Sequence, residues 1–242
     1  MEAFIEGIKS VENGNNDFLH VFFAGCNFKC PWCNTPHLLE SKEEYNQHLR
    51  DIKSQIQEFA SSIEGVIFTG GEPCLQRLSL MNLAAFCKEK QLKVHVHTNG
   101  SKPGCINSLI QDDLVDSFIL DLKSPLEESF EKITKSKTFF INTKQIINDI
   151  KSSIELLKNS EKELEIRTTI IPGWMYRKED ILKIADLVKN IECRWKLQRF
   201  EPSEQLASKK LQDIMPPSFS FMENLKEAIN KEYPNIRVYI ED

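Results

Sequence analysis

Three cysteines stand close together near the amino end of the chain. Cys26, Cys30 and Cys33 follow the spacing Cys-x3-Cys-x2-Cys, so one short loop can present three thiols to a single inorganic centre. A [4Fe-4S] cluster is usually held by four cysteine thiolates. Three local thiolates would hold such a cluster and leave one iron open to a small molecule that carries an amine and a carboxylate.

The same residues admit a zinc site or a disulfide. His37 lies four residues after Cys33, which gives the four ligands of a Cys3His zinc site, although such sites usually draw their ligands from two separate segments. The chain has seven cysteines, an odd number, and no secretory signal precedes them, which is typical of a reducing cytoplasm and disfavours a disulfide. A non-catalytic iron-sulfur or zinc protein therefore remains open from these residues alone.

Composition narrows the class of protein. The 242 residues are 40% hydrophobic and carry a formal net charge of -5, with acidic and basic residues interspersed. This predicts one domain over residues 1–242 with a sizeable core, and no large basic face for nucleic acid. The longest apolar stretches, such as 18–24, are too short to span a bilayer. We expect a cytoplasmic protein without a membrane or nucleic-acid partner.

Around the cysteines, short β-rich runs alternate with segments of helical period, which indicates a parallel sheet covered by helices, as an open doubly wound sheet or a full or partial barrel. The predicted strands are 18–23, 65–69, 92–97, 115–120, 164–171, 195–200 and a terminal strand at 237–240. The predicted helices are 43–63, 78–90, 106–113, 146–159, 180–190 and 221–232.

Polar motifs follow these strands, at the carboxyl edge where α/β folds bind ligands. Gly70-Gly71-Glu72-Pro73 follows the second strand and Thr98-Asn99-Gly100 the third; each could be an ordinary turn, or a place where backbone approaches a ligand. Asp121 and Lys123 follow the fourth strand, and Arg167 lies in the fifth. These charges could pair with neighbours or bind a charged ligand.

The motifs together resemble those of the radical S-adenosylmethionine (SAM) enzymes, and within them the activating proteins of anaerobic ribonucleoside-triphosphate reductase. The resemblance is carried by Phe23 to Asn34 with Pro36, Thr69 to Pro73 with Leu75-Gln76, Thr98-Asn99-Gly100, Leu120 to Lys123, Arg167 to Gly173 and Leu197 to Phe200. It implies an α/β fold of the radical SAM type, a partial (β/α)6 barrel of parallel strands with outer helices. The core is expected at about 18–200, with a helix and strand in 201–242.

The resemblance also implies cofactors, site residues and partners. Cys26, Cys30 and Cys33 would bind a [4Fe-4S] cluster. SAM would be held by residues of the four edge motifs: Gly70, Gly71, Glu72, Pro73, Thr98, Asn99, Asp121, Lys123 and Arg167. No catalytic residue is implied beyond these cofactor ligands. The substrate would be a glycine of a glycyl-radical protein such as anaerobic ribonucleotide reductase, and the electron donor a flavodoxin or ferredoxin.

The sequence differs from the activase motifs at two places, and a second family therefore remains an alternative. The activases commonly have Asp before Thr-Asn-Gly, where this chain has His97, and His-Asn-Pro after the last cysteine, where this chain has Asn34-Thr35-Pro36. Cys33-Asn34-Thr35 is similar to the Cys-Asp-Thr string of 7-carboxy-7-deazaguanine synthases, radical SAM enzymes that rearrange a pterin with magnesium. The roles of His97 and Cys74, and whether a cation binds near Asp121, stay open at this point.

Overall fold

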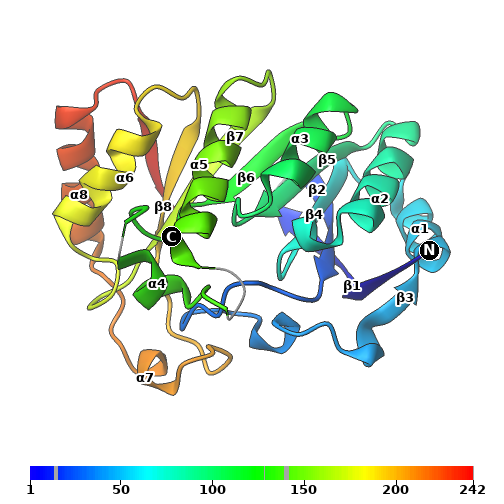
Figure 1. Ribbon diagram of the computed structural model, residues 1–242, viewed down its shortest axis with the longest axis horizontal. Helices are drawn as coiled ribbons and strands as arrows, with labels where there is room; N and C mark the ends of the chain where they lie inside the picture. The colour runs from blue at the N-terminus through cyan, green and yellow to red at the C-terminus, as the bar shows by residue number, and fades with distance from the viewer. Residues whose placement is uncertain (14–15, 128, 139–141, 242) are drawn as a thin grey trace.

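The structure is a computed structural model that describes residues 1–13, 16–127, 129–138 and 142–241. Within these residues nine strands form one sheet in the order β3-β1-β2-β4-β5-β6-β7-β8-β9 (Figure 1). The strands are β1 (Glu2–Asn13), β2 (Asn16–Phe23), β3 (Asn46–His48), β4 (Gly65–Gly70), β5 (Lys93–Thr98), β6 (Ser117–Asp121), β7 (Glu163–Ile170), β8 (Arg194–Arg199) and β9 (Arg237–Glu241).

Seven neighbouring strands, β2 and β4 to β9, pair in parallel. Helices connect them along the outer side of the curved sheet (Figure 1). The helices are α1 (Leu49–Phe59), α2 (Arg77–Glu89), α3 (Pro103–Gln111), α4 (Ser129–Thr134), α5 (Thr143–Lys158), α6 (Lys178–Val188), α7 (Lys209–Gln212) and α8 (Phe219–Glu232). This arrangement confirms the predicted α/β class with parallel strands and outer helices.

Strand β7 illustrates how the sequence sorts the two faces of the sheet. Its side chains alternate between half-buried and buried, so that Leu164, Ile166 and Ile170 pack into the core while Arg167 and Thr169 face the concave side. Side chains of a strand alternate with a period of two, which makes one sequence run supply both a hydrophobic core and a polar lining. On β7 the concave side is therefore the polar side.

Two features at the amino end differ from expectation. Strand β1 was not predicted; it pairs antiparallel with β2 and β3. The predicted helix at 43–63 begins only at Leu49, because residues 46–48 pair with Glu2, Ala3 and Phe4. Local periodicity cannot reveal the pairing of β3 with β1, because the two segments are more than forty residues apart and the partner strand supplies the hydrogen bonds.

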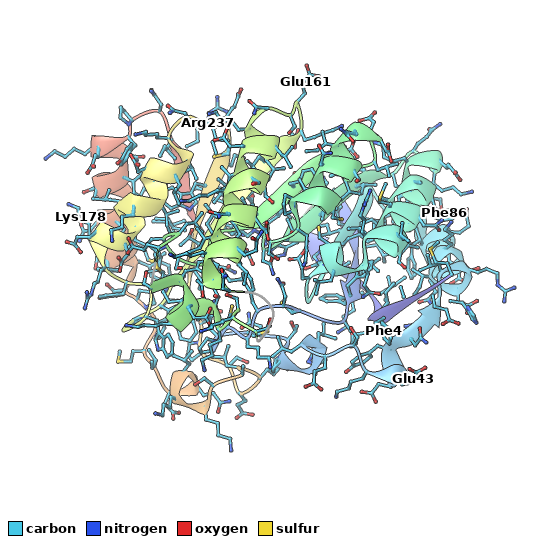
Figure 2. All side chains as sticks on the ribbon, in the orientation of Figure 1. Phe4, Glu43, Phe86, Glu161, Lys178 and Arg237 are labelled. Atoms are coloured by element: carbon cyan, nitrogen blue, oxygen red, sulfur yellow. The ribbon has the colours of Figure 1, made fainter. Side chains whose placement is uncertain are left out.

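The parallel strands give the sheet two chemically different edges. Glu161, just before β7, and Arg237, at the start of β9, lie together at the amino edge at the top of Figure 2. The loops that follow the strands gather at the opposite edge, where the predicted motifs lie. Among the described residues, no helix has both the length and the apolar character needed to cross a bilayer.

Candidate functional site

The cysteine loop begins where β2 ends and is fixed by backbone hydrogen bonds. Gly25 adopts a φ of +95°, a conformation that glycine adopts without strain, and its N–H donates to Leu38 O at 2.7 Å. Cys26 N–H donates to Leu39 O at 3.1 Å. The chain is thereby turned off the sheet and folded back across the carboxyl edge, with the three cysteines in the returning loop.

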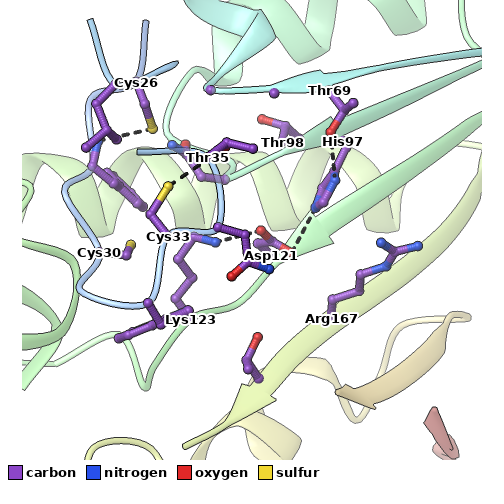
Figure 3. A pocket seen from close by; sticks show the side chains of 18 of the residues that line it. Cys26, Cys30, Cys33, Thr35, Thr69, His97, Thr98, Asp121, Lys123 and Arg167 are labelled. Atoms are coloured by element: carbon purple, nitrogen blue, oxygen red, sulfur yellow. Dashed lines mark hydrogen bonds and ion pairs between the residues drawn. The ribbon is translucent and has the colours of Figure 1, made fainter. Parts of the chain in front are cut away.

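Cys26, Cys30 and Cys33 line one cavity of about 290 Å³ at this edge (Figure 3). None of the three forms a disulfide. Burial raises the pKa of Cys26 to about 12 and that of Cys30 to about 11. The surroundings therefore keep these two thiols protonated until a positively charged centre displaces the protons, as metal binding does.

The arrangement of the thiols bears on which inorganic group they fit. Among the residues that the structure describes, no group of three His, Cys, Asp or Glu side chains is placed to hold a metal ion. His37 is exposed and lies outside the lining of the cavity. The Cys3His zinc site is thus not formed. A [4Fe-4S] cube requires no convergence on one ion, because each thiolate binds a different iron, so the three thiols lining one cavity fit the cluster.

The turn after β4 locks against the cysteine loop. Gly71 N–H donates to Phe23 O, and Glu72 N–H donates to Gly25 O, both at 2.8 Å. A Cβ built on Gly71 would lie 2.2 Å from Gly25 O, closer than real Cβ contacts, so this position requires glycine for the close approach of two backbones. Gly70 and Gly71 also line the cavity.

The side chain of Glu72 connects the turn after β4 to the turn after β5. It is fully buried, and its carboxylate accepts from Thr98 Oγ1 and Asn99 N–H, both at 2.7 Å, and from Cys74 N–H at 3.1 Å. Burial raises the pKa of Glu72 in spite of these donors. The carboxylate therefore joins the turn after β4 to the turn after β5, and it does not line the cavity.

The turn after β5 holds the cysteine loop from its other side. Asn99 Nδ2 donates to Asn27 Oδ1 at 2.9 Å, and Asn27 Nδ2 donates to Ser101 Oγ at 2.8 Å. Asn27 lies between the first two cysteines of the loop. Thr98 and Asn99 thus reach the cavity lining while they fix Glu72 and the cysteine loop.

A row of polar side chains crosses the cavity floor from β4 to the end of β6 (Figure 3). Thr69 Oγ1 lies 3.2 Å from His97 Nδ1, His97 Nε2 lies 3.0 Å from Asp121 Oδ1, and Lys123 Nζ donates to Asp121 Oδ2 at 2.6 Å. The side chains of His97, Asp121 and Lys123 are 25, 22 and 21% exposed. The row ends with an ammonium group beside the thiols.

Arg167 on β7 completes the charged lining. Its Nε donates to Glu165 Oε1 at 2.6 Å, and Tyr239 on β9 hydrogen-bonds the other carboxylate oxygen. Burial would raise the pKa of Glu165, but Tyr239 and Arg167 lower it below the ordinary value. The carboxylate is therefore ionised and holds Arg167 at the cavity wall.

Ten of the twelve predicted site residues line this cavity, and two do not. Glu72 and Pro73 are buried behind it. Cys74 is buried as well and hydrogen-bonds the Cys105 thiol; this bond and burial raise its pKa. Sequence reasoning did not assign the other lining residues, which include Phe22, Phe28, Trp32, Thr69, His97, Thr169 and Gln198. Period-two alternation from Arg167 could have indicated Thr169, which lies two residues further along the same strand; the other residues carry no comparable signal.

Comparisons with known proteins identify the family of this chain. Residues 20–188 match the family model described as the radical SAM superfamily. An inferred glycyl-radical enzyme activating enzyme of Methanocaldococcus jannaschii is 31% identical over 84% of this chain and 82% of its own. A 7-carboxy-7-deazaguanine synthase of Clostridium acetobutylicum is 32% identical over 76% of this chain and 83% of its own.

Two further comparisons concern one more relative in sequence and one solved structure. A pyruvate formate-lyase-activating enzyme of Clostridium pasteurianum is 30% identical over 71% of this chain and 69% of its own. The solved structure of a radical SAM methyltransferase from Sphaerobacter thermophilus aligns with a TM-score of 0.71 at 12% identity, over 96% of this chain and 68% of that one. The structural likeness concerns the fold alone.

Proposed function

Because the chain belongs to the radical SAM superfamily, we propose that it is an activase that generates a glycyl radical on a partner enzyme of the anaerobic ribonucleotide reductase type. The similarity to the M. jannaschii protein, which extends over 84% of this chain and 82% of that one, carries the proposal. It is supported by a cavity that joins three thiols to polar groups from the carboxyl ends of the strands.

In this proposal Cys26, Cys30 and Cys33 hold a [4Fe-4S] cluster, and SAM lies in the cavity beside it. When bound, the two cofactors supply one-electron chemistry that removes a hydrogen atom from an unactivated carbon. The protein contributes ligation, orientation and shielding. Phe22, Phe28 and Trp32 line the cavity with the thiols, so aromatic rings reduce the access of water.

The polar lining is suited to the methionine end of SAM, which carries an amine and a carboxylate. Lys123 offers an ammonium for the carboxylate, and Asp121 beside it fixes its position at 2.6 Å. Gly70 and Gly71 expose backbone at the cavity wall where no side chain intervenes. Thr98, Asn99 and Arg167 are proposed for the remaining polar groups of SAM. Glu72 and Pro73 would act by holding the turn that carries the two glycines.

The experiment uses anaerobically reconstituted enzyme, a reductant, SAM and the purified anaerobic reductases and lyases of the same genome. We expect the doublet electron paramagnetic resonance signal of a glycyl radical on one of these reductases or lyases. A Gly→Ala variant at the radical position of that partner should abolish the signal. Cleavage of SAM without a glycyl radical on any candidate partner would contradict the activase assignment and leave the radical SAM chemistry intact.

A second candidate function is that of a 7-carboxy-7-deazaguanine synthase. It is favoured by the relative from C. acetobutylicum at 32% identity. It is also favoured by Asn34 and Thr35, which follow the last cysteine of the loop and both line the cavity. Incubation with a reduced pterin substrate, SAM and magnesium, followed by mass spectrometry for a deazapurine, tests it. Formation of the deazapurine, without a glycyl radical in the experiment with the reductases and lyases, would assign the chain to the synthase activity.

The single-domain organisation and the flavodoxin or ferredoxin donor stay predictions.

A further inference from the structure

Six exposed lysines surround the cysteine loop on its outer side. One lies in the loop itself, three lie in and after α4, and two begin α7. We call them the lysine patch: Lys29, Lys132, Lys135, Lys137, Lys209 and Lys210. These segments are more than seventy residues apart in sequence, so only the fold brings the charges together.

Backbone hydrogen bonds hold the three segments against each other. Lys29 N–H donates to Thr134 O at 2.9 Å, which joins the loop to the end of α4. Ala207 N–H donates to Cys33 O at 3.2 Å, and Ser208 N–H donates to Pro31 O at 2.9 Å. Figure 1 shows α4 and α7 on the same side of the molecule, beside the blue loop. Both lysine-bearing segments therefore touch the loop that carries the thiols.

Among the described residues, ion pairs leave the charges of the patch without a partner. Within the described ranges, no ion pair involves any of the six lysines. Residues 26–34 contain no acidic side chain. Glu131 in α4 accepts hydrogen bonds from Ser136, Thr143 and the backbone of Lys137, and its carboxylate offsets one of the six positive charges. Glu204 and Asp213 flank α7. A local excess of positive charge thus stands on a chain of net charge -5.

The patch is separate from the cavity in which SAM is proposed to bind. None of its six lysines belongs to the lining of that cavity or of the smaller one at Trp32 and Arg199. A substrate must reach the cavity, whereas a partner that only exchanges an electron needs no access to it. Interfaces of electron-transfer proteins are small, and complementary charge speeds their encounter.

We propose that the lysine patch is the docking surface for an acidic one-electron carrier protein of the flavodoxin or ferredoxin class. The inference rests on the proposed function in that it requires a reducible cluster on Cys26, Cys30 and Cys33. In the transfer the reduced carrier loses one electron and the cluster gains it. No covalent bond forms or breaks between the two proteins.

The test measures binding of the reconstituted enzyme to three probes: a bacterial ferredoxin, a flavodoxin and a single-stranded DNA oligonucleotide. Lys209→Glu/Lys210→Glu and Lys135→Glu/Lys137→Glu should each weaken carrier binding about tenfold at low ionic strength, because steering by charge is lost, and high salt should remove the difference. Carbodiimide cross-linking followed by mass spectrometry should join carrier carboxylates to patch lysines.

Lys53→Glu/Lys90→Glu is the matched control, because it reverses two charges beside Phe86, at the other side of the molecule in Figure 2. This variant should bind carriers like the unaltered enzyme. Equal weakening by control and patch variants, or no weakening by either, overturns the proposal. A larger effect of the patch variants on binding of DNA than on binding of the two carriers also overturns it.

SAM cleavage separates this inference from the proposed function. With dithionite as reductant, patch variants should cleave SAM at the rate of the unaltered enzyme, and with a reduced carrier they should be slower. Absence of dithionite-driven cleavage in the unaltered, cluster-loaded enzyme would contradict the proposed function, whereas the binding and cross-linking results would still decide the docking surface.

Discussion

His97 Nε2 lies 3.0 Å from Asp121 Oδ1, across the boundary between β5 and β6. Burial would raise the pKa of Asp121, but the charges and hydrogen bonds of Lys123 and His97 lower it well below its ordinary value. Burial likewise opposes the charge on Lys123, and Asp121 raises its pKa above the ordinary value. An ionised carboxylate is thus held between an imidazole and an ammonium.

This relationship predicts that His97 positions Lys123 through Asp121. His97→Ala should weaken SAM binding about fivefold, equivalent to about 1 kcal/mol for a lost hydrogen bond. His97→Gln keeps a donor and should recover part of the affinity. Isothermal titration calorimetry under anaerobic conditions measures both. His95→Ala is the control, since His95 lies on the same strand, against Phe18 and outside the cavity; equal losses in the two alanine variants would contradict the prediction.

The three loop cysteines should differ from the other four in their effect on iron. Reconstituted enzyme should bind about four iron per chain, and Cys30→Ala should bind far less because one of three ligands is lost. Cys87→Ala, which removes a buried thiol from α2, should keep the full iron content. Iron and sulfide analysis with absorption spectroscopy provides the measurement, and stoichiometric zinc in place of iron would be inconsistent with the cluster.

Gly71→Ala should damage the site through the protein backbone. Its Cβ would meet Gly25 O at 2.2 Å and Leu38 O at 3.1 Å, so the cysteine loop must move, at a cost of about 1–3 kcal/mol. Gly104→Ala at the start of α3 has nothing within 4 Å of the added Cβ and should stabilise the fold by up to about 1 kcal/mol. Thermal unfolding compares the two, and iron content should fall in Gly71→Ala alone.

The stability of the fold should depend on pH through Asp116. This residue directly precedes β6 and contacts α2 through Lys88 and β5 through Val94. Burial would raise its pKa, but the ion pair with Lys88 at 2.6 Å and the hydrogen bond from Val94 N–H at 2.8 Å lower it. A carboxyl with a lowered folded-state pKa contributes stability above its unfolded pKa and loses it as pH falls through the folded pKa.

Asp116→Asn should therefore lower the free energy of unfolding at neutral pH by about 1 kcal/mol or less, because the pair is partly exposed to solvent. The difference from the unaltered protein should shrink as pH falls below about 4, near the ordinary pKa of aspartate. Urea unfolding at several pH values measures it. A difference that stays constant down to the acid range would mean that Asp116 acts by packing alone.

Much of the fold could be predicted because local sequence determines it. Helix α8 and strand β8 lie within two residues of their predicted bounds, since hydrophobic period and strand composition are properties of short segments. The Cys26-Cys30-Cys33 spacing likewise indicated that the three thiols lie together, because one loop contains all of them, and all three line one cavity. Their placement at the carboxyl edge followed from the parallel order of strands.

Contacts between distant segments were decided only by the tertiary structure. Nothing local predicts that His97 meets Asp121, because the pair depends on the register of β5 against β6. Glu72 was expected to hold SAM, yet its carboxylate is enclosed by donors from Thr98, Asn99 and Cys74, which reach it only when two turns pack together. The lysine patch forms for the same reason. Spacing in sequence determines which groups one segment presents, whereas strand register and packing determine which groups they meet.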